Sequence, residues 1–303
     1  MRLDRLLAGL FLATPLACVS TTPALRAEAP VAALTAPASP GEAPVPGEGN
    51  LRVMTFNIQS AVRGLDNVAG LIRSAAPDIV ALQEVDVGST RAQGLDQPAE
   101  LARRTGLTHS AHFRTTDLFG GAYGVALLSR YPLESVEQFP LPVTTGTEPR
   151  TVARAILKVH GQEVSVYVTH LTRRPFNGDV RVRQTAAILA LMAKDPRPKL
   201  VMGDLNDTPE SGSLRLFKRE LADVFALRGR GAADTYPLPV IPNLRIDYVL
   251  ASSRFLPRSS QVLRVLASDH YPVVADLTLL APPVAPGGEQ APPEALTASA
   301  SSP

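Results

Sequence analysis

Hydrophobic and polar residues alternate, or form short apolar runs, in many brief segments between residues 51 and 280. A two-residue period is typical of half-buried strands, and a continuous apolar run of similar length is typical of strands buried on both faces. The predicted strands are Leu51–Ile58, Asp78–Glu84, Tyr123–Ser129, Leu133–Phe139, Thr151–Val159, Glu163–Thr169, Leu200–Met202, Asn243–Ala251, Gln261–Leu266 and Val273–Leu279. The arms on either side of His160-Gly161 alternate in phase and predict a hairpin.

A helical period appears in fewer and shorter segments. The predicted helices are Leu65–Ala75, Pro98–Gly106, Asp179–Lys194 and Ser211–Arg219. In the third helix we expect Val182, Ala186 and Leu189 to face inward, and Arg181 and Gln184 to face solvent or a site. Because strands dominate and helices intervene only between some of them, the pattern predicts a layered α/β domain with mixed sheets.

The first 18 residues differ from this domain and predict an export signal. Arg2 and Arg5 precede an apolar run that ends at Ala17 and is too short to cross a bilayer comfortably. Cys18, the sole cysteine, follows directly, and P-L-A-C resembles the lipobox of bacterial lipoproteins, although Pro15 stands where Leu is usual. A lipid-anchored chain is therefore expected, with ordinary signal cleavage near Ala27 as the alternative.

Residues 19–50 and 281–303 consist mainly of Ala, Pro, Thr, Ser and Gly. Such segments bury too little surface to offset the entropy of ordering, so they are interpreted as a linker and a disordered tail. The intervening domain, residues 51–280, contains no cysteine, which excludes disulfides and thiolate metal sites there. Its 27 Lys and Arg against 22 Asp and Glu leave a surplus of five positive charges, which would tolerate a polyanion without requiring one.

Polar residues suited to catalysis cluster at predicted strand ends. They are Asn57, Glu84, His170, Asp204, Asn206, Asp269 and His270, with Asp247 inside a strand. Asp204 and Asn206 point to one side of an extended backbone, so together they can face a phosphate, a water molecule or a hard cation. The alternative is an Asx turn that caps the backbone of Thr208-Pro209-Glu210. No Gly-rich phosphate loop, G-x-S-x-G elbow or H-E-x-x-H helix is present.

The order of the motifs is more specific than any one of them. Along about 220 residues the chain contains T-F-N-I, L-Q-E, V-T-H-L, G-D-L-N, R-I-D-Y-V-L and S-D-H-Y-P. This series resembles the endonuclease/exonuclease/phosphatase superfamily, which includes deoxyribonuclease I and bacterial sphingomyelinases. The resemblance implies a four-layered α/β sandwich with two packed mixed β-sheets and one divalent-metal site at the strand ends.

The resemblance also implies a role for each motif residue. Glu84 corresponds to the principal Mg²⁺ ligand, with Asn57 beside it and Asp269 as a second acid near the metal; Mn²⁺ or Ca²⁺ are alternatives. His270, oriented by Asp247, corresponds to the general base or a phosphate contact. The remaining predicted catalytic residues are Asp204 and Asn206, which would position the attacking water and a phosphate oxygen, and His170.

The implied function is an exported, metal-dependent phosphoesterase, in the first place a phosphodiesterase such as a nuclease. A sphingomyelinase-like phospholipid phosphodiesterase, a phosphatase and a non-catalytic binding lipoprotein are the alternatives. Arg150 and Arg154 are the predicted substrate-binding residues, with solvated salt bridges as the other interpretation. The expected partners are a nucleic acid or a phospholipid head group and, through the lipid anchor, a membrane; the chain is expected to be a monomer, periplasmic, membrane-anchored or secreted.

Overall fold

The computed structural model describes residues 49–173, 177–238 and 244–282. The predicted export signal, Cys18 and nearly all of the linker and the tail lie outside these residues; Asn50, which was assigned to the linker, begins the first strand. Within the described part of the chain, no helix combines the length and apolar character needed to span a bilayer.

Two mixed sheets form the body of the domain. The first has the strand order β10-β12-β13-β1-β2-β4-β3 and the second β5-β6-β7-β8-β11-β9. The strands of the first sheet are β1 (Asn50–Asn57), β2 (Ile79–Val87), β3 (His109–Leu118), β4 (Gly121–Ser129), β10 (Gly229–Arg230), β12 (Phe255–Val262) and β13 (Val273–Leu279). Those of the second are β5 (Leu133–Leu141), β6 (Arg150–Val159), β7 (Gln162–His170), β8 (Lys199–Asp204), β9 (Ala222–Asp223) and β11 (Asp247–Ala251).

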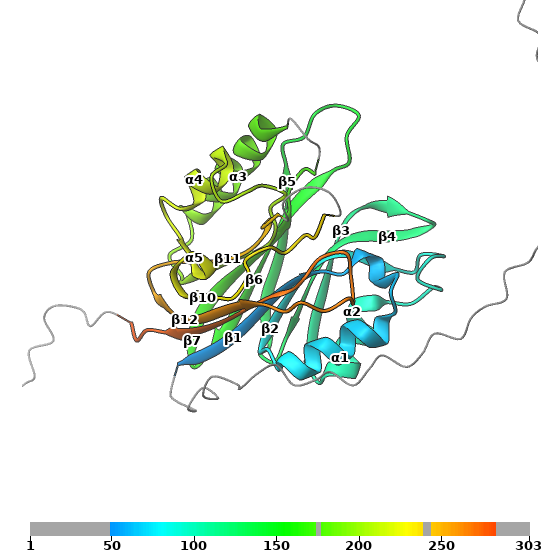
Figure 1. Ribbon diagram of the computed structural model, residues 1–303, viewed down its shortest axis with the longest axis horizontal. Helices are drawn as coiled ribbons and strands as arrows, with labels where there is room; N and C mark the ends of the chain where they lie inside the picture. Colours follow the sequence, from blue (N-terminus) through cyan, green and yellow to red (C-terminus); the bar gives the residue numbers. More distant parts are fainter. Residues whose placement is uncertain (1–48, 174–176, 239–243, 283–303) are drawn as a thin grey trace, which may run out of the picture. The chain divides into compact units, whose positions relative to one another are not determined.

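Helices cover the outer faces of the sheets, except Val224–Arg228, which packs on β11 and β12 with Val224 in the cluster between the sheets. They are α1 (Leu65–Ala75), α2 (Gln97–Thr105), α3 (Gly178–Met192), α4 (Gly212–Phe217) and α5 (Val224–Arg228), with a 3₁₀ turn η1 at Gln59–Ala61. In Figure 1, α1 and α2 lie together on one side of the molecule, and α3 and α4 lie on the other. Each pair packs on its own sheet through a separate apolar cluster.

A third apolar cluster joins the inner faces of the two sheets. It contains Val53 and Ile79 from the first sheet and Val166, Leu200 and Met202 from the second. These side chains are essentially inaccessible to solvent, and each buried aliphatic side chain contributes about 1.5–3 kcal/mol. Helices, sheet, sheet and helices therefore form four layers, and the predicted four-layered sandwich with two packed mixed sheets is confirmed.

Two parallel crossovers bring several strand ends to one edge. β1 continues through α1 into β2, and β7 continues through α3 into β8, and each pair of strands is parallel. Parallel neighbours connected by a helix end on the same side of a sheet. The carboxyl ends of four strands are fixed in this way.

Three sequence-based predictions differ from the structure. β3 was not predicted, and the strand expected at Gln261–Leu266 is β12, Phe255–Val262, which carries an irregularity between Pro257 and Ser259. In α3 the prediction is correct only in part: Leu189 packs against the outer core, but Ala186 is exposed. Arg181 and Gln184 are buried instead, because they form hydrogen bonds to Thr172 in the neighbouring loop.

Candidate active site

Strand register brings most of the predicted polar residues to the shared edge of the two sheets. Asp204, the last residue of β8, is the register partner of His170 at the end of β7 and of Asp247 at the start of β11. On the first sheet, Asn57 pairs with Gln83, directly before Glu84. Each of these strands has buried aliphatic residues along its length and polar residues where it reaches the shared edge.

The G-D-L-N segment owes its glycine to a close approach between β7 and β8. A Cβ atom on Gly203 would lie 1.9 Å from the carbonyl oxygen of Thr169, so a larger residue would push the strands apart. Beyond Asp204 the chain turns, with Asn206 in the left-handed region at φ 49°. The Asn206 backbone N–H donates to Asp204 Oδ1 (2.8 Å) and its side-chain amide donates to the Leu171 carbonyl (3.1 Å). Asp204 therefore forms an Asx-type turn onto Asn206, whereas the predicted alternative, capping of Thr208-Pro209-Glu210, is not seen among the described hydrogen bonds.

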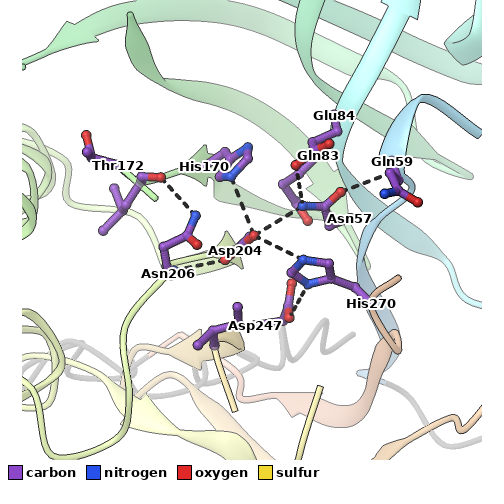
Figure 2. Close-up of polar contacts among 12 residues, drawn as sticks. Asn57, Gln59, Gln83, Glu84, His170, Thr172, Asp204, Asn206, Asp247 and His270 are labelled. Atoms are coloured by element: carbon purple, nitrogen blue, oxygen red, sulfur yellow. Dashed lines mark hydrogen bonds and ion pairs between the residues drawn. The ribbon is translucent and has the colours of Figure 1, made fainter. Parts of the chain in front are cut away.

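Asp204 lies at the centre of the group (Figure 2). Its Oδ2 accepts a hydrogen bond from Asn57 Nδ2 (3.1 Å), and it lies 3.5 Å from His170 Nε2 and 3.7 Å from His270 Nε2. Burial and the nearby Asp247 carboxylate raise the pKa of Asp204 to about 7. A carboxylate with such a pKa can exchange a proton near neutral pH.

His270 and Asp247 form a buried pair. Their Nδ1 and Oδ2 atoms are 2.9 Å apart, and the ring of Tyr236 lies 4.7 Å from the His270 ring, centroid to centroid. Burial lowers the pKa of His270, but the Asp247 and Asp204 carboxylates outweigh it and raise the pKa to about 10. The imidazole is therefore protonated at neutral pH.

Glu84 occupies a bulge in β2, where the register with β4 shifts between Gln83 and Val85. Its φ is 56°, a left-handed conformation that turns the side chain away from the strand pattern. Asn57 Nδ2 donates to Glu84 Oε1 (3.1 Å). Burial raises the pKa of Glu84, and the half-buried Asp269 carboxylate adds to this effect.

These oxygen donors fit a divalent cation. No hydrogen bond to Glu84 other than that from Asn57 is found among the described residues, and a desolvated carboxylate near a second acid gains from a cation. Carboxylate and amide oxygens are the ligands that Mg²⁺ and Ca²⁺ prefer. The residues therefore fit the divalent metal ion that the resemblance implies.

A second group could hold a metal by distance alone, since one ligand atom of each of Asp204, Asp247 and His270 lies within 4.8 Å of the others. However, both ring nitrogens of His270 face carboxylates of this group. The imidazolium supplies one positive charge in contact with these two acids, whereas no ion pair to Glu84 is found among the described residues. The Glu84 side is the better cation site on these grounds.

His170 and Arg150 lie at the opposite flank. Burial, with the cations Arg150, His270 and Arg173 nearby, lowers the pKa of His170 well below its usual value, so the ring is neutral. Its Nε2 has no hydrogen-bond partner in the described part of the chain, and the same holds for Arg150 Nε. Both are buried polar atoms, which gain free energy from a hydrogen-bond partner.

Arg154 is not brought to this group. It lies four residues along β6 from Arg150, contacts Glu137 and Asp195, and its guanidinium packs near the Phe139 ring. The structure gives its predicted substrate-binding role no geometric support. Tyr123, an aromatic residue of β4, lines a small hollow together with His170.

Several residues that support the site carry no recognisable sequence signal. The Thr235 hydroxyl accepts hydrogen bonds from the backbone N–H groups of Ile246 and Asp247. On α3, the Gln184 side chain bonds to the backbone N–H and the hydroxyl of Thr172. A threonine in a loop and a glutamine on a helix are ordinary in isolation, so only the fold reveals these roles.

Two packed mixed sheets, flanked by helices and with a histidine–carboxylate cluster at the strand ends, define an α/β sandwich of the deoxyribonuclease I type. The model of the Endonuclease/Exonuclease/phosphatase family matches residues 54–270. The chain belongs to this family, whose members are phosphoester hydrolases. A search of curated proteins finds no match.

Solved structures agree with this fold. The crystal structure of an endonuclease/exonuclease/phosphatase from Beutenbergia cavernae DSM 12333 is 29% identical, with 76% of this chain and 72% of that chain covered and a TM-score of 0.66. The human Nocturnin catalytic domain with bound sulfate anion is 21% identical, with 76% of this chain and 93% of that chain covered and a TM-score of 0.62. The mannosyl-6-phosphatase from Bacteroides thetaiotaomicron VPI-5482 is 17% identical, with 75% of this chain and 99% of that chain covered and a TM-score of 0.61. The last two likenesses concern the fold alone.

Proposed function

We propose that this protein is a Mg²⁺-dependent phosphodiesterase, in the first place a nuclease, that catalyses in-line attack of water on phosphorus. The observation that carries the proposal is the position of Asp204. It lies between a protonated histidine–carboxylate pair, His270–Asp247, and an oxygen-donor pair, Glu84–Asn57. A base, a cationic hydrogen-bond donor and a cation site thus face one small volume.

Glu84 and Asn57 would hold the metal ion, with Asp269 as a further acid beside it. A bound divalent cation supplies positive charge that neutralises the non-bridging phosphate oxygens as the transition state forms. Asn57 bonds to both Glu84 and Asp204. It therefore fixes the distance between the cation site and the base.

Asp204 is the candidate general base. Because its pKa is raised to about 7, a large fraction is ionised at neutral pH and yet basic enough to take a proton from water. The backbone N–H of Asn206 holds the other carboxylate oxygen, so the one facing the site keeps its direction. The resemblance left His270 as either the general base or a phosphate contact, and its raised pKa favours the second role, as a donor.

His270 would donate its Nε2 proton to a phosphate oxygen, while Asp247 holds Nδ1 and so fixes the ring. The neutral His170 and the buried guanidinium of Arg150 lie on the other side of Asp204 and can contact the remaining oxygens. Because Arg150 has an unpartnered Nε among the described residues, a phosphate would satisfy it.

The test is hydrolysis of bis-p-nitrophenyl phosphate, a diester, against p-nitrophenyl phosphate, a monoester, with Mg²⁺ and with chelator. We expect metal-dependent cleavage of the diester that is lost in Glu84→Ala and retained in Glu134→Ala, an exposed glutamate on β5. Plasmid DNA, RNA and sphingomyelin would then be compared, and Mn²⁺ and Ca²⁺ tried beside Mg²⁺.

Preference for the monoester would mean that the protein is a phosphatase and not a phosphodiesterase. Preference for sphingomyelin would mean that it is a lipid hydrolase and not a nuclease. Turnover that survives Glu84→Ala would contradict the metal assignment. Metal binding with no turnover of any tested phosphoester would point to a non-catalytic binding lipoprotein instead.

We further propose that the chain is exported as a monomer and anchored to a membrane through lipid on Cys18. The support is sequence alone: two arginines, an apolar run to Ala17, and cysteine directly after. Expression of the full chain and of Cys18→Ser, followed by fractionation, tests this. We expect the wild type in membranes and the variant in the soluble exported fraction; identical distributions would contradict the anchor.

A further inference from the structure

A cavity of about 450 Å³ lies where the edges of the two sheets meet. Its walls come from β3 of the first sheet and from β5 and β6 of the second. Two contacts join these edges: Gln138 Nε2 donates to the Arg114 carbonyl (2.7 Å), and the hydroxyls of Thr115 and Thr151 are 3.2 Å apart. A β-bulge between Arg114 and Thr116 accompanies the second contact. The cavity is thus a feature of the joined sheets.

This cavity borders the candidate active site. Thr115, Arg150 and Thr151 line it and also line a smaller hollow whose other side is formed by His170 and Tyr123. Arg150 therefore has one side toward the reaction centre and one toward the cavity. The hollow beside His170 has no room for a water molecule, so Arg150 and Thr151 form a shared wall, and a group bound in the cavity lies across Arg150 from His170.

The polar part of the lining is cationic. Arg114 and Arg150 contribute to it, and no carboxylate does so in the part of the chain that the structure describes. Arg150 is 94% buried, being 6% exposed, and its Nε has no partner among those residues. The acids that pair with the two arginines, Asp117 and Glu148, have side chains that are 60% and 40% exposed. The Arg114–Asp117 pair is exposed on both sides, so it contributes little and can be exchanged for a phosphate. At the buried Arg150, the Nε without a partner among the described residues is the group that a phosphate would satisfy, since phosphate binds guanidinium groups bidentately.

The remaining wall is apolar. Pro140, Leu141, Val143 and Pro149 line it. Val143 is partly exposed, whereas Leu141 is buried. Such a wall suits the ring of a sugar or base more than it suits water. An anion with an attached ring matches both halves of the cavity.

We infer that the cavity binds a second phosphate group of the substrate, with the ring that carries it, while the first phosphate is hydrolysed at Asp204. The inference rests on the proposed phosphodiesterase activity and specifies its substrate. The substrate is a molecule with two phosphates separated by one nucleoside or one sugar ring. A nucleic acid strand and a small bisphosphate both have this chemistry.

The experiment compares substrates that differ in one phosphate. The full chain is assayed on the dinucleotide d(TpT), on its phosphorylated forms d(pTpT) and d(TpTp), and on bis-p-nitrophenyl phosphate, which has no second phosphate. We expect kcat/KM for one phosphorylated dinucleotide to exceed that for d(TpT) by about tenfold or more, as for a charge-assisted contact. Equal values for the three dinucleotides would overturn the inference.

Matched variants locate the effect. Arg114→Gln and Val143→Asp should each reduce the preference for the phosphorylated dinucleotide, because one removes a cation and the other adds an anion. Arg103→Gln is the control, since Arg103 also forms an exposed i,i+3 ion pair, but on α2. A preference that persists in Arg114→Gln and Val143→Asp would show that the second phosphate binds elsewhere.

A binding measurement separates this inference from the proposed function. Titration calorimetry with chelator and the unreactive Asp204→Asn protein compares d(TpT) with its phosphorylated forms, and glucose 6-phosphate with glucose 1,6-bisphosphate. Tighter binding of the ligand with the extra phosphate, reduced by Arg114→Gln, supports the inference even if bis-p-nitrophenyl phosphate is not cleaved. A gain confined to nucleotides or to the sugar identifies the source; no gain for either contradicts it.

Discussion

Two buried aspartates at opposite ends of β8 have opposite electrostatic surroundings. Asp195, before the strand, is 3% exposed, and Asp204, its last residue, is 1% exposed. Asp195 accepts hydrogen bonds from the Tyr167 hydroxyl (2.9 Å) and from the backbone and guanidinium of Arg197 (both 3.1 Å). Burial would raise its pKa, but the donors around it outweigh burial and lower the pKa. For Asp204, burial and Asp247 prevail and raise it.

The difference separates a structural carboxylate from a reactive one. Asp195 is held ionised by donors and stabilises the end of the sandwich at which it lies. Asp204 also accepts hydrogen bonds, from Asn57 and from the backbone of Asn206, but it is fully buried beside the Asp247 carboxylate. A site that buries two carboxylates side by side retains a base near neutral pH, at a cost in stability.

The largest effect that tests this comparison is on turnover. Asp204→Asn should lower kcat for bis-p-nitrophenyl phosphate by roughly 10²–10⁴-fold, the contribution typical of a general base. Asp195→Asn should leave kcat near the wild-type value, because no predicted catalytic residue contacts Asp195. Steady-state kinetics on both proteins decide the matter. Comparable losses in the two variants would show that Asp204 acts only on the fold.

The second effect is on the free energy of unfolding, and here Asp195 should matter more than Asp204. Asp195→Asn leaves the buried donors around it poorly paired and should cost about 1–3 kcal/mol, which lowers Tm by about 2–4 °C per kcal/mol. Asp179→Asn, which removes an exposed carboxylate on α3, should change stability by less than about 0.5 kcal/mol. Thermal unfolding at pH 7 measures both.

Acid sharpens this second prediction. The folded-state pKa of Asp195 lies below its ordinary value of 3.8, so its contribution is present above that value and is lost as pH falls through the folded pKa. The stability difference between wild type and Asp195→Asn should therefore shrink in strong acid. A constant difference between pH 7 and pH 2 would indicate that the charge of Asp195 is not responsible.

Much of this arrangement follows from the sequence. The helix Leu65–Ala75 was predicted with the bounds that α1 has, and the hairpin around His160-Gly161 is present in β6 and β7. The motif residues were expected at strand ends, and register brings Asn57, His170 and Asp204 to one edge. Periodicity reports burial on one face of an element, and these elements have such faces.

Other features depend on which elements meet in three dimensions. β3 escaped prediction because half-exposed and polar residues prevail along it, without a regular period. The buried Arg181 pairs with Asp207 across 26 residues, so its side of α3 could not be recognised as inward. Asp195 lies in an ordinary K-D-P-R stretch. The cavity at Arg114 arises from two strand edges, and no local pattern describes such a junction.

The third effect comes from the metal. If Glu84 is its principal ligand, saturating Mg²⁺ should stabilise the wild-type protein, by about 2.7 kcal/mol at a concentration one hundred times Kd. Glu84→Gln should lose most of this gain, whereas Asp195→Asn should retain it despite its lower starting Tm. Thermal unfolding with Mg²⁺ and with chelator measures the gain. An undiminished gain in Glu84→Gln would move the cation to another set of ligands.

The smallest effect concerns Glu84 without metal, and it has the opposite sign to that of Asp195. Burial raises the pKa of Glu84 above its ordinary value of 4.5, so folding disfavours its charge. Below pH 4.5 the group is protonated in both states and the cost is absent; it develops as pH rises through the folded-state pKa. Glutamine keeps an oxygen that can accept a hydrogen bond from Asn57, and it carries no charge.

In chelator, Glu84→Gln should therefore match the wild type near pH 4 and be slightly more stable at pH 8, by about 1 kcal/mol or less. Denaturant unfolding at the two pH values measures this difference, and a variant less stable than wild type at pH 8 would place Glu84 with Asp195 among the structural carboxylates.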